Sequence, residues 1–347
     1  MSTQTWQEYE VRHGKSSEGA LDELHRCIQR QKRGEETFTR EKRYPRCLFE
    51  DLGKSVIVVP SRLTYRFAES VQGYFELKST EDASLETSLF ESNVDALLES
   101  GNLISEEVGI IDLGCGSGSK GAQIAMTLMG RGHDVLCTCV DGSPRMLRAS
   151  QDRMNQLGIS CDSKQLRFEA FPGQDLNAFR PKSGGMLLVL FLGCTYGNYD
   201  PVDIGGILNN PTLEATDLVM IGTGTAPQQK KVAFVQETLM DYWNPVMRLA
   251  LLEAIGFMKA ELQNHVAYNP QREQFEMYVL VRKVSNPILR GLGIVPGDIF
   301  LTGVARRPCR DRLREELSKY FDTQLSSDDA RGPYHTVAFC RPRPLRH

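Results

Sequence analysis

The stretch Ile110-Ile-Asp-Leu-Gly-Cys-Gly-Ser-Gly-Ser-Lys120 decides the fold of this 347-residue chain. An apolar segment runs directly into three glycines at alternate positions, Gly114, Gly116 and Gly118. Glycine has no Cβ, so the backbone can turn tightly there and approach a ligand closely. Residues 119–130 then have the pattern of a helix, whose first N–H groups lack partners within the helix and can bind a polar ligand. The sequence therefore predicts a strand, a ligand-binding turn and a helix.

The next apolar segment, residues 134–140, ends at Asp141, whose carboxylate can accept hydrogen bonds from both hydroxyls of a ribose. Strand, glycine turn, helix, strand and terminal acid form half of a nucleotide-binding α/β unit. Dinucleotide-binding turns favour the spacing G-x-G-x-x-G. Here the spacing is G-x-G-x-G and Asp112 precedes it. Such a turn suits a ligand with an amino-acid tail, whose ammonium would meet Asp112 and backbone carbonyls.

This turn resembles motif I of class I S-adenosylmethionine-dependent methyltransferases, which implies S-adenosylmethionine as the cofactor. A tight turn in some other α/β protein is the alternative, but the agreement between the turn and Asp141 favours the cofactor site. The residues expected to bind the cofactor are Asp112, Gly114, Gly116, Gly118, Lys120, Asp141, Gly142, Ser143, Phe171 and Gly193.

The composition is that of an ordinary globular protein, with 41% hydrophobic and 24% charged residues. A net charge of −3 argues against nucleic acid as a partner. No run reaches the roughly 18 apolar residues of a membrane span, and the first residues lack a signal-peptide pattern, so we expect a cytoplasmic protein without a membrane partner. The nine cysteines include no C-x-x-C pair, and we expect no metal site. A small molecule is the expected substrate.

The alternation of apolar segments along the chain predicts a doubly wound α/β fold with a mainly parallel sheet. The strands are expected at residues 108–113, 134–140, 166–171, 186–193 and 217–222, with a last strand at 336–340 after a helix at 312–321. We expect three parts: a helical N-terminal extension over residues 1–60, a Rossmann-like core over 61–222 and 301–347, and an inserted α+β substrate domain over 223–300.

A second group of functional residues follows the fourth expected strand, where residues 190–201 run Leu-Phe-Leu-Gly-Cys-Thr-Tyr-Gly-Asn-Tyr-Asp-Pro. Open α/β sheets bind their ligands at this carboxyl edge. Asn198 can both donate and accept, which suits a zwitterionic amino acid, and the rings of Tyr196 and Tyr199 can face a sulfonium. These three are the candidate catalytic residues. The alternative is a glycine turn whose aromatic residues only pack.

The segment Phe191–Asn198 resembles the substrate loop of histidine-specific Nα-methyltransferases of the ergothioneine pathway. Other pieces follow in the order of that family: Val140-Asp141-Gly142-Ser143, Trp243-Asn244-Pro245-Val246-Met247 and Phe275-Glu276-Met277. The resemblance covers residues 63–342. It implies a Rossmann-like methyltransferase core with an inserted substrate domain, an asparagine that holds the head of the substrate amino acid, and a methionine that shapes its pocket. Those two residues are Asn198 and Met277.

The chain departs from the family where the family has an acid and a hydroxyl that grip the imidazole of histidine. Here the segment is Thr302-Gly303-Val304-Ala305, so both polar groups are absent. A site that lacks the hydrogen-bonding groups for a polar ring loses its preference for that ring. Histidine is therefore not the expected substrate, and the pocket should be larger and less polar. The residues expected to bind substrate are Phe75, Thr195, Met277, Gly303 and Ala305.

Another departure concerns the adenine, for which the family has an acid at the end of the third strand. In this chain that position is either Ala170 or Glu169.

Three functions fit these patterns. The first is N-methylation of the α-amine of an amino acid, or of a related amine, other than histidine. The second keeps the fold but has no acceptor: the α-amine of S-adenosylmethionine attacks its own γ-carbon, giving azetidine-2-carboxylate and methylthioadenosine. The third is a non-catalytic S-adenosylmethionine-binding protein.

Overall fold

A computed structural model describes residues 15–34, 55–59, 85–99, 106–182, 184–193, 195–199, 201–225, 232–238, 249–327 and 335–343. The chain divides into two compact units. The core unit comprises residues 80–232, 270–274 and 305–347, and the second unit comprises residues 1–79, 233–269 and 275–304. Among the described helices, none combines the length and the apolar character needed to cross a membrane.

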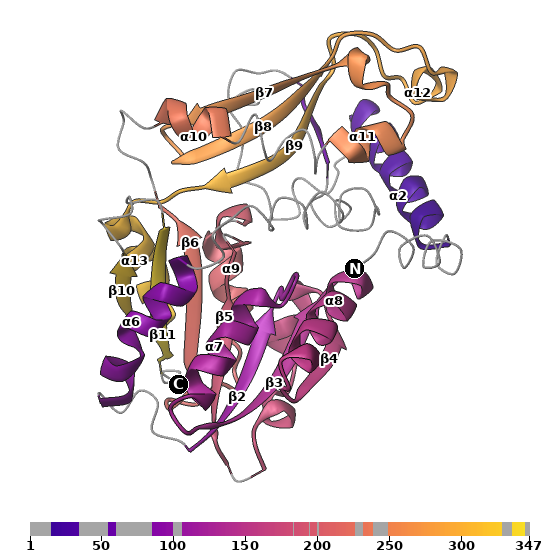
Figure 1. The fold of residues 1–347 in the computed structure, drawn as a ribbon. Helices are drawn as coiled ribbons and strands as arrows, with labels where there is room; N and C mark the ends of the chain where they lie inside the picture. The colour runs from indigo at the N-terminus through magenta and orange to yellow at the C-terminus, as the bar shows by residue number, and fades with distance from the viewer. Residues whose placement is uncertain are drawn as a thin grey trace. The chain divides into compact units, whose positions relative to one another are not determined.

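The core unit is built on a seven-stranded sheet in the order β10-β11-β6-β5-β2-β3-β4 (Figure 1). The strands are β2 (Glu107–Leu113), β3 (Asp134–Asp141), β4 (Cys161–Gln165), β5 (Met186–Phe191), β6 (Leu218–Gly224), β10 (Phe321–Ser327) and β11 (His335–Pro342). Neighbouring strands from β4 to β6 pair in parallel, whereas β11 is antiparallel to both β6 and β10. The strand order reverses beside β2, as in doubly wound nucleotide-binding folds. The prediction of a class I methyltransferase fold is confirmed.

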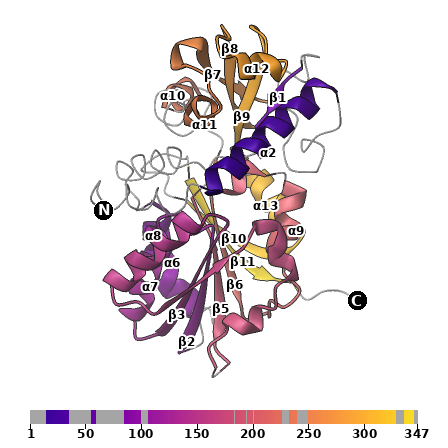
Figure 2. The ribbon, with the colours of Figure 1, turned by 90° about the vertical axis from the view of Figure 1, so that its right-hand side faces the viewer.

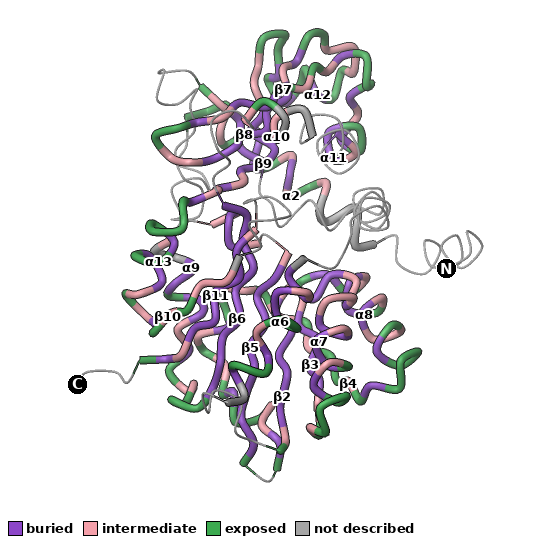
Figure 3. The backbone as a smooth tube through the Cα atoms, turned by 60° about the vertical axis from the view of Figure 1, so that its left-hand side comes forward, coloured by how far each residue is buried: buried purple, intermediate pink, exposed green. Residues whose placement is uncertain are grey.

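Helices cover both faces of this sheet and make a three-layer arrangement (Figure 2). On one face lie α6 (Leu85–Glu99), α7 (Ser119–Met129) and α8 (Pro144–Gln156). On the other face lie α9 (Pro201–Leu208), α13 (Arg310–Ser318) and the 3₁₀ turns η1 (Phe168–Gly173), η2 (Leu176–Phe179) and η3 (Thr195–Asn198). The central strands β2, β5 and β6 are buried along most of their length (Figure 3), since apolar side chains point into both layers.

The prediction of a third strand at residues 166–171 is wrong. The strand is β4, which ends at Gln165, and Phe168 begins the 3₁₀ turn η1. Among the described strands, β4 pairs with β3 alone and lies at the edge of the sheet, so it does not need the apolar pattern that a buried strand requires. Glu169 and Ala170, the residues expected near the adenine, consequently lie within η1 and not at a strand end.

The helix expected at residues 312–321 also ends early, because Phe321 begins β10.

The second unit contains a four-stranded sheet in the order β1-β9-β8-β7. Its strands are β1 (Ile57–Val58), β7 (Leu262–Asn269), β8 (Gln274–Val281) and β9 (Ile299–Arg306), and its helices are α2 (Lys15–Lys32), α10 (Val232–Thr238), α11 (Ala250–Ala254), η7 (Lys259–Glu261) and α12 (Pro287–Gly291). Residues of α2, α11 and α12 pack with strand residues in one hydrophobic cluster.

The described N-terminal residues belong to this second unit. β1 pairs in parallel with β9, and the Gln31 side chain of α2 both donates to the Val58 carbonyl (2.9 Å) and accepts from the Val58 N–H (2.7 Å). The three-part domain division that we expected stays a prediction. A pairing between residues more than 240 positions apart leaves no local pattern in the sequence.

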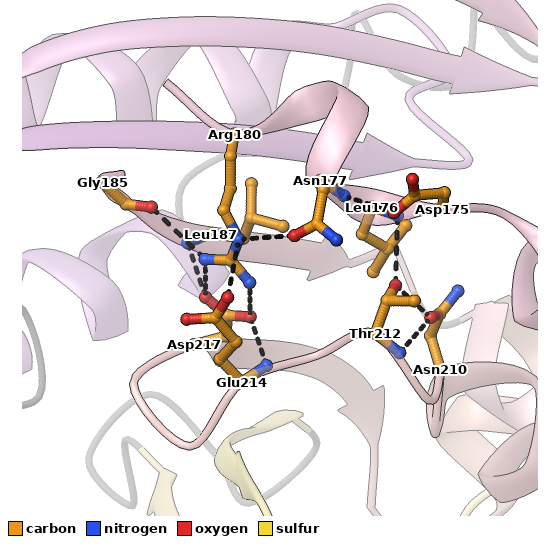
Figure 4. A network of polar contacts seen from close by, with 10 residues as sticks. All are labelled: Asp175, Leu176, Asn177, Arg180, Gly185, Leu187, Asn210, Thr212, Glu214 and Asp217. Atoms are coloured by element: carbon orange, nitrogen blue, oxygen red, sulfur yellow. Dashed lines mark hydrogen bonds and ion pairs between the residues drawn. The ribbon is translucent and has the colours of Figure 1, made fainter. Parts of the chain in front are cut away.

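A buried ion pair closes the amino ends of β5 and β6 (Figure 4). The Arg180 guanidinium donates to both carboxylate oxygens of Asp217 (2.7 and 2.6 Å), and Asp217 also accepts the N–H groups of Leu187 (2.9 Å) and Glu214 (2.7 Å). Asp217 is fully buried, so its charge requires these partners. These contacts connect the loops at this edge and have a structural role. The glycine turn after β2, Asp141 at the end of β3 and the loop after β5 lie at the opposite, carboxyl edge.

Candidate functional site

The glycine turn adopts the backbone conformation that its sequence predicts. Gly114, Gly116 and Gly118 all have positive φ angles, of 80°, 53° and 71°. The Gly114 N–H donates to the Val140 carbonyl (2.7 Å), which joins the turn to the end of β3. A Cβ on Gly118 would lie 2.6 Å from the Ser150 Oγ atom. Residues with side chains would be strained at these angles, so the turn requires glycine.

Asp141 lies at the end of β3 and its carboxylate is held by two backbone groups. One oxygen accepts from the Gly116 N–H (3.3 Å) and the other from the Ser143 N–H (2.8 Å), at the start of α8. Burial raises the pKa of Asp141 to about 6, although its backbone hydrogen bonds act in the opposite direction. The structure therefore brings together Asp141, Gly116 and Ser143, three of the residues expected to bind the cofactor, with the exposed Gly142 between two of them.

Asp112 is buried at the end of β2, and its carboxylate faces Gly121 in the first turn of α7, where a Cβ would overlap it. Burial raises the pKa of Asp112 to about 7, the negative charges of Asp141 and Glu86 add to this effect, and Lys120 opposes it. Two acids with raised pKa values thus lie beside one turn. Such a pair creates a negative potential that a bound cation would relieve.

Replacement of Asp112 by asparagine is expected to stabilise the protein near pH 8 and to change little near pH 4. The pKa of Asp112 is about 7 in the folded protein and near 3.8 in an unfolded chain, so the folded protein holds this proton more tightly. The contribution of Asp112 to the free energy of unfolding is therefore fully present below pH 3.8 and is lost as the pH rises through 7. An asparagine does not titrate and escapes this loss. Thermal unfolding of both proteins from pH 4 to pH 8 measures the difference, and parallel curves would contradict the assignment.

An aromatic cluster lies against the glycine turn. The ring of Phe168 packs so close to Gly114 that a Cβ there would lie 2.9 Å from Cζ. Phe168 makes edge contacts with Phe191 (5.5 Å between centroids) and Tyr199 (5.9 Å). Phe171, which we expected to bind the cofactor, is buried in the hydrophobic core. Both phenylalanines belong to the same 3₁₀ turn η1. The sequence does not show which ring packs against the glycine turn and which enters the core, because this depends on the path of η1.

Tyr196, a candidate catalytic residue, is buried and anchors η3. Its hydroxyl donates to Glu316 Oε2 (2.9 Å), and Glu316 Oε1 accepts from Arg306 Nη2 (2.7 Å). Burial and the Glu316 charge raise the pKa of Tyr196. The hydroxyl of Thr195 donates to the Leu192 carbonyl (3.2 Å). These contacts favour the packing alternative for Tyr196, because its hydroxyl is already used within the protein.

Asn198 ends η3 and is half-buried, and its side chain makes no hydrogen bond to any residue in the described part of the chain. The neighbouring Gly197 packs against the backbone of Arg306, where a Cβ would lie 2.5 Å from the carbonyl oxygen. Tyr196 and Gly197 thus fix the backbone just before Asn198. The backbone at Asn198 is therefore fixed, and the donor and the acceptor of its amide have no partner among the described residues.

Gly193 and Lys120, both expected to bind the cofactor, are joined by a residue that we did not predict. The Gly193 N–H donates to both carboxylate oxygens of Glu86 (3.1 and 3.2 Å), and the Lys120 ammonium contacts the same carboxylate. Glu86 lies on α6, far from either motif in the sequence. No local pattern separates it from the other acids of that helix.

Three of the expected substrate residues, Met277, Gly303 and Ala305, lie on the neighbouring strands β8 and β9. Met277 on β8 is buried, and its carbonyl accepts from the Thr302 hydroxyl (3.1 Å), which immediately precedes Gly303 on β9. Ala305 follows two positions later on β9 and is assigned to the core unit. Phe75 and the segment 243–247 lie outside the described residues. In the part of the chain that is described, no group of three or more metal-ligating side chains comes together.

One protein-family model matches the sequence of this chain. The model of a family described as "Histidine-specific methyltransferase, SAM-dependent" matches residues 81–291. A search of curated proteins found no match.

Among solved structures, an S-adenosylmethionine-dependent methyltransferase from Clostridium acetobutylicum is 11% identical, with a TM-score of 0.46 over 79% of this chain and 98% of that one. The PH0226 protein from Pyrococcus horikoshii is 12% identical, with a TM-score of 0.42 over 78% and 98%. SAM-bound CalS10, an amino pentose methyltransferase from Micromonospora echinaspora, is 11% identical, with a TM-score of 0.36 over 79% and 97%. These likenesses are remote.

Proposed function

Because the chain belongs to the family of histidine-specific, S-adenosylmethionine-dependent methyltransferases, we propose that it methylates the α-amine of an amino acid other than histidine. The chain has the fold of a family whose members are S-adenosylmethionine-dependent methyltransferases. The identity of the acceptor is the proposal. The observation that carries it is Asn198, whose side-chain amide makes no hydrogen bond to the described residues and whose backbone is fixed by Tyr196 and Gly197 on the loop that follows β5.

The residues at the glycine turn fit this cofactor. S-adenosylmethionine carries an ammonium and a sulfonium, and Asp112 and Asp141 have raised pKa values, so a bound cation would favour their ionised forms. Asp141 would accept the ribose hydroxyls, and the backbone of the turn would face the amino-acid tail. When bound, the cofactor supplies a methyl group on a sulfonium, activated for displacement.

The protein's own contribution is orientation. Methyl transfer is a displacement, and alignment of the reacting atoms can contribute roughly 7 to 11 kcal/mol. Asn198 would hold the amino-acid head of the acceptor, with its NH₂ group donating to the carboxylate and its oxygen accepting from the amine. Phe168 packs against Gly114 of the glycine turn and makes an edge contact with Tyr199. A sulfonium bound over the face of either ring would be attracted to it.

The altered segment on β9 supports an acceptor other than histidine. Gly303 and Ala305 stand where the family has an acid and a hydroxyl for the imidazole. Removal of these groups leaves more space and fewer hydrogen-bonding partners, which suits an aliphatic or aromatic amino acid better than a polar ring.

Product analysis tests this function. The purified protein is incubated with S-adenosylmethionine alone and with each member of an amino-acid panel. The proposal requires S-adenosylhomocysteine only when an acceptor is present, together with a methylated amine. Methylthioadenosine in the absence of an acceptor would instead identify the cyclase reaction. Cofactor binding without any product across the panel would identify a non-catalytic protein.

Restoration of the imidazole-binding groups by the double substitution Gly303→Glu with Ala305→Ser is expected to increase histidine binding at least about tenfold, because a hydrogen-bonded substrate group contributes strongly to selection. Isothermal titration with histidine in the presence of S-adenosylhomocysteine measures it. The double variant Gly303→Gln with Ala305→Ser, of similar size but without the charge, is the matched control. No gain in either variant would mean that this segment does not face the acceptor.

A further inference from the structure

Glu86 has contacts that neither the cofactor site nor the acceptor loop explains alone. It is the second residue of α6 and is 2% exposed. Its carboxylate accepts the Gly193 N–H with both oxygens and contacts the Lys120 ammonium. β6 makes room for it at Gly222, where a Cβ would overlap the carboxylate. Four elements of the core unit therefore meet at this one side chain.

The carboxylate is ionised in this environment. Burial alone would raise the pKa of Glu86, but the positive charges of Lys120 and His335 and the hydrogen bonds from Lys120 and Gly193 outweigh it, so the pKa lies below its ordinary value. A buried ion pair contributes little net stability compared with apolar side chains of similar size, whereas the removal of one partner is costly. An ion pair at this place therefore specifies geometry more than it stabilises the fold.

The two partners of Glu86 belong to the two functional loops. Lys120 is the second residue of α7, directly after the glycine turn, and Gly193 (φ 80°) begins the loop that carries Asn198. We infer that Glu86 is a positioning residue that fixes the acceptor loop relative to the cofactor turn. The expected effect of Glu86 on turnover rests on the proposed function. A displacement requires the donor and acceptor groups in one fixed alignment, and small misplacements reduce the rate steeply.

The substitution Glu86→Gln tests the inference, because glutamine keeps the shape and removes the charge. We expect kcat to fall about tenfold, while the dissociation constant of S-adenosylmethionine changes less than about threefold. Hydrogen exchange should also become faster at the Gly193 amide, since a neutral acceptor binds this N–H more weakly than a carboxylate. The exchange measurement needs no acceptor and reports directly on the hydrogen bond.

Glu91→Gln is the matched control. Glu91 is an exposed acid on the same helix and contacts α7 through Gln123 and Thr127, so its loss should leave both kcat and exchange at Gly193 unchanged. Lys120→Met removes the other half of the ion pair and should reproduce the slower turnover of Glu86→Gln. The double variant Glu86→Gln with Lys120→Met should be no slower than either single variant. If a single variant fails to fold, the double variant, which leaves neither charge of the ion pair buried without its partner, still carries the test.

Unchanged kcat together with unchanged exchange at Gly193 in Glu86→Gln would overturn the inference. An equal fall in cofactor affinity and kcat would also overturn it, because Glu86 would then act through the cofactor site. A wild-type protein that is inactive with every acceptor would refute the proposed function instead, and exchange at Gly193 would still decide whether Glu86 holds the acceptor loop.

Discussion

Replacement of Asn198 by alanine is expected to lower turnover about a hundredfold or more and to leave cofactor affinity within about threefold of wild type. The backbone of η3 is fixed by Tyr196 and Gly197 independently of the Asn198 side chain, so alanine should not disturb the loop. Its amide makes no hydrogen bond within the described part of the protein, and the loss should fall on the acceptor alone. Steady-state kinetics with the best acceptor of the panel and calorimetry with S-adenosylmethionine measure the two quantities.

Asn155→Ala provides a control, since Asn155 is an exposed residue of α8. Its turnover should equal that of wild type. If Asn198→Ala weakens cofactor binding as much as it slows turnover, then Asn198 belongs to the cofactor site or to the fold, and the proposed acceptor contact is wrong. A lower melting temperature in Asn198→Ala would point to the fold.

Replacement of Asp141 by alanine is expected to weaken S-adenosylmethionine binding by about 2 to 3 kcal/mol, or roughly 30- to 150-fold. Its carboxylate is fixed by the N–H groups of Gly116 and Ser143, which hold it in place for the ribose without further reorganisation. In the wild type, the pKa of about 6 implies that cofactor affinity also declines as the pH falls below this value, because the proton removes the charge that attracts the cation.

Calorimetry at pH 8 and at pH 5.5 measures both effects. Asp134→Ala at the exposed beginning of the same strand is the matched control and should bind the cofactor normally. The wild type should lose affinity at the lower pH, and Asp141→Ala should lose less. Unchanged affinity in Asp141→Ala at pH 8 would exclude Asp141 from the cofactor site, whatever the acceptor is.

The main elements of the core could be predicted from the sequence because their signals are local. The apolar strand before Gly114, the three glycines and the acid at the end of the next strand all lie between residues 107 and 141. The glycines are required by the positive φ angles of the turn. The observed φ angles and the contacts of Asp141 follow from that pattern. By contrast, β4 is an edge strand that needs no apolar pattern, and it was misplaced by five residues at its start.

The sequence by itself determined the methyltransferase fold, the glycine turn and the loop that carries Asn198, because steric restrictions on the backbone act between neighbouring residues. Only the tertiary structure decided that Phe168, and not Phe171, lies against the turn. It also decided that the Tyr196 hydroxyl donates to Glu316 and that Glu86 joins the two loops. Each of these depends on contacts between residues far apart in the chain. Burial then determines which side chains keep a polar group available for a ligand and which use it within the protein.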